Sequence, residues 1–168
     1  MKKYQNILIA AVLVWILTRE QARAETNTPG TPRGIRNNNP GNIRISNNQW
    51  RGKIPVSQNT DGSFEQFESM EMGVRAAILN LLSYIRGGTY TVKGIVSKWA
   101  PSSENDTGAY IQFVVDCSGL RPDEGLNTYD RIKISKLLEC MFLMENGTRF
   151  RNLLPNQRKI IEVWETYI

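Results

Sequence analysis

The chain has 168 residues, and 21 Lys and Arg against 16 Asp and Glu give a formal net charge of +5, without any histidine. The lack of histidine excludes a Ser-His-Asp triad, a Cys-His protease pair and an HExxH zinc site, and two cysteines alone cannot form a zinc site. Catalysis would therefore rest mainly on carboxyl, hydroxyl or amine groups, and we predict no cofactor and no metal.

The first 24 residues have the layout of a secretory signal. Lys2 and Lys3 precede an apolar run over residues 7–17, and an A-x-A cleavage pattern follows at residues 22–24. An uncleaved membrane anchor is the alternative, because charged residues surround the cleavage pattern. Either segment would export the remainder to the periplasm or hold it at a membrane, and residues 25–33 would be a polar linker.

The basic charge is concentrated in this leader. Four basic residues and one acidic residue lie before residue 25, which leaves a net charge of only +2 for the rest of the chain. No long Lys/Arg block occurs in that remainder, so we expect no nucleic-acid partner.

Residues 34–67 are rich in Asn, Gly and Pro and lack helical periodicity, which predicts a loop or short hairpin lobe. Trp50, Phe64 and Phe67 bring flat apolar faces of the kind that stack on sugar rings. The alternative is that the Asn residues only cap turns and that the aromatic side chains fill a small core.

Hydrophobic periodicity predicts helices in the rest of the chain. They should run from Ser69 to Arg86, over residues 91–99, from Asp106 or Thr107 to about residue 118, from Thr128 to Gly147, and from Pro155 or Asn156 to the end. The predicted fold is mainly α, an α+β arrangement of about five helices with a small lobe, and its active site should lie between lobe and helices. Cys117 and Cys140 fall on two of these helices, where they can pair in an oxidising compartment or remain separate buried thiols.

The helix that ends at residue 147 carries a carboxylate on its apolar face. Ile134, Leu138 and Met141 recur at helical spacing, and Glu145 takes the next position on that face. Burial penalises the charged form, so such a Glu has a raised pKa and can hold a proton near neutral pH, as a glycosidase general acid must. The alternative is a solvated Glu at a frayed helix end. Glu139 lies on a different face and should be solvated.

Three segments resemble a family of phage virion and prophage proteins that are taken to act as peptidoglycan-degrading, lysozyme-like enzymes. They are residues 34–44 (GIRNNNPGNIR), residues 92–107 (VKGIVSKWAPSSENDT) with Ala109 and Tyr110, and residues 144–147 (MENG). The last helix segment also resembles the helix of lytic transglycosylases that ends in Glu-Ser-Gly or Glu-Asn-Gly and carries the catalytic acid. In glucosaminidase-type relatives this helix comes first, whereas here it comes last, which implies a circularly permuted lysozyme-like domain over residues 34–168.

The resemblance implies roles for five residues. Glu145 would be the catalytic acid. Asn39, Asn42 and Arg44 would line the sugar groove as substrate-binding residues. Tyr110, which matches a T-x-x-Y pattern, would lie near the acid and orient substrate or water, with a core tyrosine as the alternative.

A hydrolase would also need a second carboxylate or the substrate's own acetamido group. Asp61, Glu65 and Glu68 are the candidates in the lobe, and Glu68 is also a candidate substrate-binding residue. Its position just before Ser69 suits equally a residue that supports the helix N-terminus, and Asp106 is better explained as a helix cap than as a catalyst.

The function implied is cleavage of the β-1,4 glycosidic linkage of peptidoglycan, of the lytic transglycosylase or the muramidase/glucosaminidase type, by a virion-associated protein acting in cell entry or lysis. The expected partners are glycan strands, a membrane through the N-terminal segment, and other virion proteins. The alternative is a non-catalytic, membrane-anchored virion component that has a structural or glycan-binding role.

Overall fold

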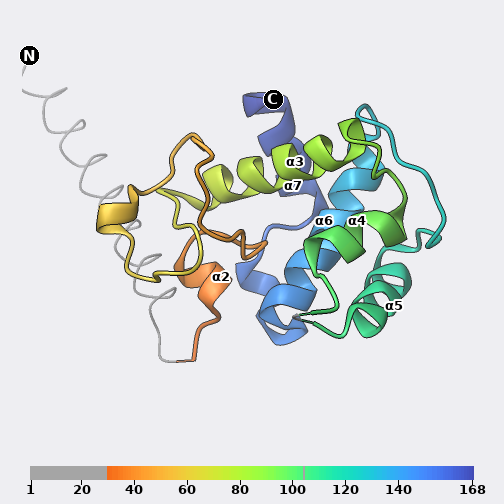
Figure 1. Cartoon of the computed structure of the whole chain (residues 1–168), viewed down its shortest axis with the longest axis horizontal. Coiled ribbons are helices and arrows are strands. Elements are labelled where there is room, and N and C mark those ends of the chain that lie inside the picture. The colour runs from red at the N-terminus through yellow and green to blue at the C-terminus, as the bar shows by residue number, and fades with distance from the viewer. Residues whose placement is uncertain (1–29, 104) are drawn as a thin grey trace, which may run out of the picture. The chain divides into compact units, whose positions relative to one another are not determined.

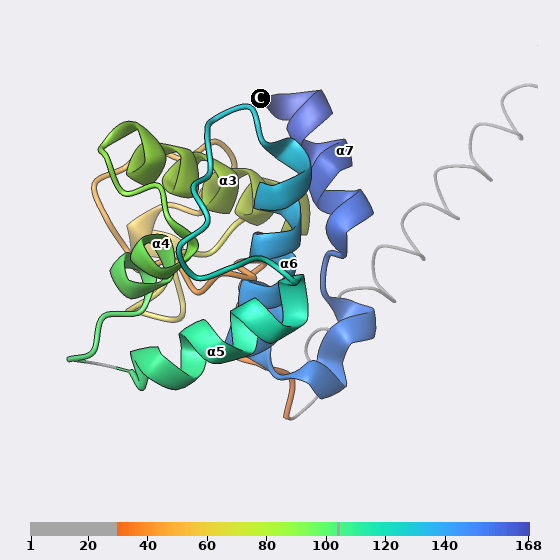
Figure 2. The ribbon, with the colours of Figure 1, turned by 90° about the vertical axis from the view of Figure 1, so that its right-hand side faces the viewer.

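Helix α6 (Arg131–Asn146) lies at the centre of the described part of the chain. The computed structural model describes residues 30–103 and 105–168. Helices α3, α5 and α7 pack around α6, as the two views in Figures 1 and 2 show. Residues on several sides of α6 are buried: Ile134, Leu138 and Met141 lie on one face, and Cys140 and Leu143 lie on others. Such burial is expected of a helix that other elements surround.

The five predicted helices are all present. They are α3 (Met70–Arg86), α4 (Val92–Trp99), α5 (Thr107–Ser118), α6 and α7 (Gln157–Tyr167). The segments that were not foreseen are the short helix α2 (Arg33–Arg36) and two 3-10 turns, η1 (Val56–Gln58) and η2 (Thr148–Leu153). The prediction of a mainly α-helical fold is confirmed, whereas the permuted lysozyme-like topology stays a prediction.

Side-chain caps mark the starts of helices α4, α5 and α7. Thr91 accepts a hydrogen bond from the backbone N–H of Gly94, Asp106 accepts one from Ala109, and Asn156 accepts one from Lys159. These bonds satisfy backbone donors that have no partner inside the helix. Ser69 occupies the predicted N-cap position of α3, but its side chain makes no capping bond.

The start of α6 differs from the prediction. We expected Thr128 to begin this helix, but it begins at Arg131. Residues 127–130 form a turn instead, in which Asp130 Oδ2 accepts a hydrogen bond from the Asn127 N–H (2.9 Å). Asx side chains compete with helix in this way.

The lobe before α3 contains no regular strand among the described residues, so the hairpin alternative is wrong. Its pairing consists of isolated antiparallel bridges, Arg44 with Phe64 and Lys53 with Phe67. Side chains supply bonds that a ladder would otherwise make. Asn38 Nδ2, for example, donates to the Phe67 carbonyl (3.0 Å).

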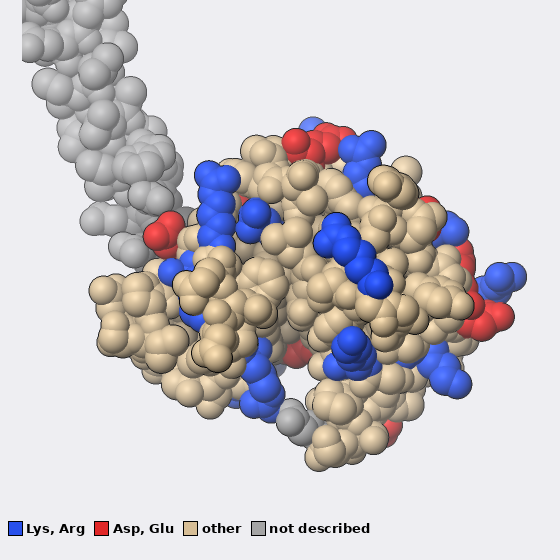
Figure 3. Space-filling model, turned by 45° about the horizontal axis from the view of Figure 1, so that its top comes forward, with Lys and Arg blue, Asp and Glu red and all other residues tan. Residues whose placement is uncertain are grey.

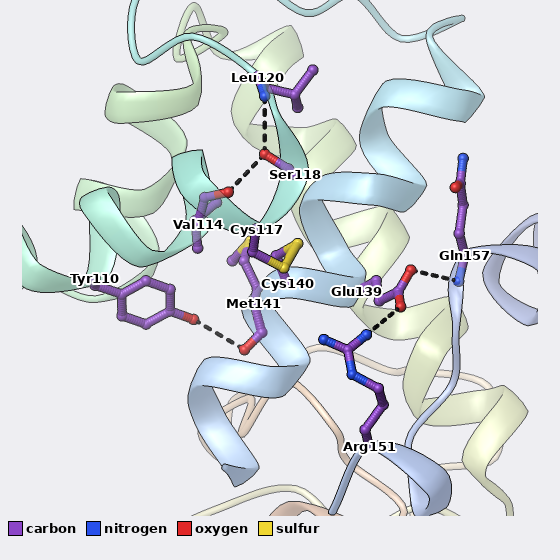
Figure 4. Close-up of a disulfide and its surroundings, with 10 residues drawn as sticks. All are labelled: Tyr110, Val114, Cys117, Ser118, Leu120, Glu139, Cys140, Met141, Arg151 and Gln157. Carbon is purple, nitrogen blue, oxygen red and sulfur yellow. Dashed lines mark hydrogen bonds and ion pairs between the residues drawn. A yellow bond between two sulfur atoms is a disulfide. The ribbon is translucent and has the colours of Figure 1, made fainter. Parts of the chain in front are cut away.

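A disulfide joins helices α5 and α6. Cys117 of α5 and Cys140 of α6 are bonded to each other, and Figure 4 shows this bond with Tyr110 on the same side of α5. Of the two alternatives for these cysteines, the structure therefore contains the pair.

The predicted leader, residues 1–24, and most of the predicted linker lie outside the described residues. Within residues 30–103 and 105–168, no helix combines the length and apolar character that crossing a bilayer requires.

Candidate active site

Two segments that are more than 100 residues apart in sequence meet at the C-terminal end of α6. Asn146 Nδ2 donates to the carbonyl of Pro40 (2.8 Å) and to that of Phe142 (2.9 Å). A Cβ atom added to Gly34 would collide with Asn146 Oδ1, so only glycine permits this close approach. The Asn-rich segment of the lobe is thus locked against the residue that follows Glu145.

Glu145 is held between two hydrogen-bond donors from different elements. Asn42 Nδ2 from the lobe donates to Oε2 (2.9 Å), and the Tyr110 hydroxyl from α5 donates to Oε1 (2.9 Å). Asn42 has φ 48°, in the left-handed region that Asn adopts more readily than most residues. Both carboxyl oxygens are therefore oriented by the fold.

Burial raises the pKa of Glu145 above its ordinary value of 4.5, although hydrogen bonds from Asn42, Tyr110 and Trp99 act in the opposite direction. Burial also raises the pKa of Tyr110, and the neighbouring Glu145 carboxylate adds to that rise. Tyr110 consequently stays protonated and remains a donor. The position of Glu145 on the apolar face of α6 is confirmed, and the Glu is half-buried rather than frayed into solvent.

Glu145 lines a groove with a volume of about 550 Å³ between the lobe and helices α3 and α4. Figure 3 shows that this face is hollowed, with Lys and Arg side chains on both sides of the hollow. Aromatic and amide side chains make up much of the lining, a composition that suits a carbohydrate ligand. The lining residues are Asn42, Ile43, Arg44, Ser46, Asn48, Trp50, Phe64, Asn80, Tyr84, Lys98, Trp99, Ala100, Pro101, Asn105 and Glu145.

The chain is 34% identical over 154 residues to "Protein P5" of Pseudoalteromonas phage PM2, an alignment that covers 88% of this chain and 89% of that protein. The chain belongs to the P5 family. No protein-family model matches it. The prediction of a phage protein family is confirmed, while peptidoglycan degradation stays a prediction because the name of the relative states no activity.

In this P5-family protein, three of the predicted site residues line the groove together. Asn42 and Arg44 lie there with Glu145, and the Arg44 guanidinium sits 5.1 Å from the centroid of the Phe64 ring. Tyr110 is buried behind Glu145 rather than in the groove, and it contacts the acid directly.

Two predicted substrate-binding residues lie elsewhere. Asn39 is fully buried, where its amide nitrogen donates to the carbonyls of Ile43 and Glu65 (both 2.9 Å) and its oxygen accepts from the Ile43 N–H (2.9 Å). Asn39 therefore shapes the loop and does not line the groove. Glu68 is exposed and is not among the lining residues.

None of the three candidates for a second carboxylate lines the groove. Asp61 accepts from Asn37 Nδ2 (2.9 Å) and lies 3.7 Å from the Arg33 guanidinium. Glu65 is fully buried against Lys53. Among the described residues that line the groove, Glu145 is the only carboxylate.

The prediction that Glu139 is solvated is wrong. Glu139 is half-buried rather than solvated, because it accepts hydrogen bonds from Arg151 (3.2 Å) and from the Gln157 N–H at the start of α7 (3.0 Å). It does lie on a different face of α6 from Glu145, as expected.

The residues that form one wall of the groove were not predicted from the sequence. Trp99 and Tyr84 form this wall with ring centroids 6.3 Å apart, and Lys98 Nζ lies 4.6 Å from the centroid of Tyr84. The available signal was a tryptophan at a helix end two residues before Pro101, inside the segment over residues 92–107 that carries the resemblance. Of the three aromatic residues that were predicted to stack on sugars, Trp50 and Phe64 line the groove, whereas Phe67 is in the core.

No group of three or more Asp, Glu or Cys side chains that could hold a metal ion occurs in the part of the chain that the structure describes. The described residues of the groove bring one carboxyl group, that of Glu145, together with donors that orient it.

The raised pKa of Glu145 predicts how stability responds to its replacement. A raised folded-state pKa lowers the stability of the fold as pH rises from the ordinary value of 4.5 through the folded value, because the charged form is the penalised one. Glu145→Gln should therefore melt at a higher temperature than the parent protein at neutral pH, with a difference that shrinks as the pH falls through the folded-state pKa toward 4.5. Thermal melts across this range test it, and equal melting temperatures at every pH would contradict it.

Proposed function

We propose that this protein cleaves the glycosidic linkages of peptidoglycan, with Glu145 as the general acid. The observation that carries the proposal is a half-buried carboxyl group with a raised pKa, oriented by Asn42 and Tyr110, at a groove lined with aromatic side chains. A general acid needs its pKa near the working pH, and desolvation is the usual way to raise that of a carboxyl group. Because the chain belongs to a phage protein family, this activity would serve entry into the host cell or its lysis.

In the first step, protonated Glu145 donates its proton to the glycosidic oxygen between N-acetylmuramic acid and N-acetylglucosamine. The bond from that oxygen to C1 breaks, the leaving sugar departs as a neutral alcohol, and C1 acquires oxocarbenium character. Asn42 and Tyr110 donate to the carboxylate that results, so they stabilise the charge that develops on Glu145.

For the second step, we propose that the 6-hydroxyl oxygen of the muramyl unit attacks C1 while its proton passes to the Glu145 carboxylate. This route needs no second carboxylate, and Glu145 is the only one among the described residues of the groove. It regenerates protonated Glu145 and yields a 1,6-anhydro sugar. A hydrolase would instead add water at C1.

Mass analysis of muropeptides tests both steps together. The full-length protein is incubated with purified sacculi, and the soluble products are compared with those of a known muramidase. We expect disaccharide peptides that are lighter by one water than the muramidase products. Products of full mass would overturn the anhydro step alone, and the absence of soluble products would overturn the proposed function.

The pH dependence of the reaction should carry the signature of Glu145. Activity should fall as pH rises through the raised pKa of Glu145, because the general acid must hold a proton. Tyr110→Phe keeps the buried ring but removes a hydrogen bond that lowers this pKa, so the alkaline limb of kcat/KM should move to higher pH. A limb that stays in place or moves to lower pH would contradict this assignment.

A further inference from the structure

One wall of the groove is a loop that has little backbone pairing of its own. Ser46, Asn48 and Trp50 line the groove, and we call residues 46–50 the groove loop. Hydrogen bonds within it are local, such as that from the Asn48 N–H to Ser46 Oγ (3.3 Å). The isolated bridges of the lobe, at Arg44 and at Lys53, lie on either side of the loop. Something other than a β-ladder must therefore fix its shape.

A buried ion pair next to the groove loop binds the backbone of the loop instead. Lys53 Nζ lies 2.8 Å from Glu65 Oε1, and the two side chains are 10% and 0% exposed. The same Nζ donates to the carbonyl oxygens of Ser46 (2.7 Å) and Asn48 (3.3 Å). Glu65 Oε1 also accepts from the Ser46 N–H (3.0 Å). The ammonium group thus reaches into the loop and binds its backbone.

A contribution to the stability of the fold does not by itself explain why this ion pair is buried. Removing both charges from water costs several kcal/mol per ion, and a buried pair is often no more stable than apolar residues of the same size. Glu65 Oε2 is buried as well, and no described residue donates to it, which adds a further cost. What the pair supplies is a fixed geometry for the groove loop.

We propose that Lys53 and Glu65 are positioning residues that hold the groove loop for glycan binding. This inference rests on the proposed function. Neither residue lines the groove and neither contacts Glu145, so both should act on substrate affinity and not on the chemical step. Trp50, an aromatic side chain of the kind that stacks on sugars, is the residue whose position should matter most.

The test uses the full-length double variant Lys53→Met/Glu65→Leu, in which apolar side chains of similar size replace both charges. KM for sacculi, and Kd for an N-acetylglucosamine oligomer, should rise on the order of tenfold with kcat nearly unchanged, since only uniform binding is lost. The pH profile should also stay in place, because the surroundings of Glu145 are unaltered.

The matched control is Ile160→Ala, a core substitution on α7 that lowers stability away from the groove. We expect KM and Kd of this control to equal those of the parent protein at a temperature where all variants are folded. If the double variant keeps parental KM and Kd, or if the control raises them equally, the inference is overturned while the proposed function stands. If the parent protein neither cleaves sacculi nor binds the oligomer, both are overturned.

Discussion

Glu145→Gln should reduce the release of muropeptides from sacculi by about 10²- to 10⁴-fold, the range that general acid catalysis supplies. The amide has nearly the size of the carboxyl group but has no proton to give to a leaving oxygen. Full-length protein and variant are compared by initial rates of soluble product under identical conditions. Release of muropeptides by the variant at the parental rate would overturn the catalytic role of Glu145.

The site can accommodate the amide side chain, so a loss of activity in this variant would reflect the missing proton and not a disturbed fold. Asn42 Oδ1 is buried without a hydrogen-bond partner among the described residues, so rotation of the Asn42 amide would present an acceptor to the Gln nitrogen. The Tyr110 hydroxyl can still donate to the Gln oxygen. We therefore expect the variant to fold and to bind sacculi as the parent protein does.

Glu139→Gln is the matched control on the same helix. Glu139 is also half-buried and hydrogen-bonded, but it faces Arg151 and α7 instead of the groove. Its replacement should leave the rate of clearing within about twofold, since it has no part in the proposed proton transfer. A non-catalytic glycan-binding protein would show the opposite pattern, with no clearing by the parent protein and equal sacculus binding by all three.

The central helix was predictable because its signal is local. Ile134, Leu138 and Met141 recur at the spacing of one helix face, and that spacing puts Glu145 on the same face, although it leaves open a solvated helix end. The helix caps at Thr91, Asp106 and Asn156 could be expected for the same reason, because each bond spans only three residues. Local patterns therefore predict the five longer helices and the face of α6 that carries the acid.

The partners of the acid depend on contacts that no local pattern contains. Asn39 and Asn42 have the same side chain three residues apart, yet one is fully buried and the other reaches Glu145. The difference follows from the left-handed turn at Asn42 and from the contact between Asn146 and Pro40, which is long-range. Trp99 escaped prediction likewise, because its place beside Gly41 follows only from the packing of α4 against the lobe.

Removal of the disulfide should lower the free energy of unfolding by about 3 kcal/mol, the value expected for closing a loop between cysteines 23 residues apart. The variant is Cys117→Ala/Cys140→Ala, compared with the parent protein by denaturant unfolding with and without a thiol reductant. Cys117 is exposed, so the reductant can reach the bond. We expect the reductant to lower the unfolding midpoint of the parent protein and to leave that of the variant unchanged.

The effect on catalysis should follow from stability and not from a change in the site. The bond ties α5 to α6 about two helical turns from Tyr110, but the Tyr110–Glu145 hydrogen bond and the apolar contacts between these helices remain without it. A crosslink acts mainly on the unfolded chain, so the folded variant should keep the parental kcat at low temperature and lose activity at a lower temperature on heating. A variant that is folded but has a much lower kcat in the cold would show instead that the bond sets the distance between Tyr110 and the acid.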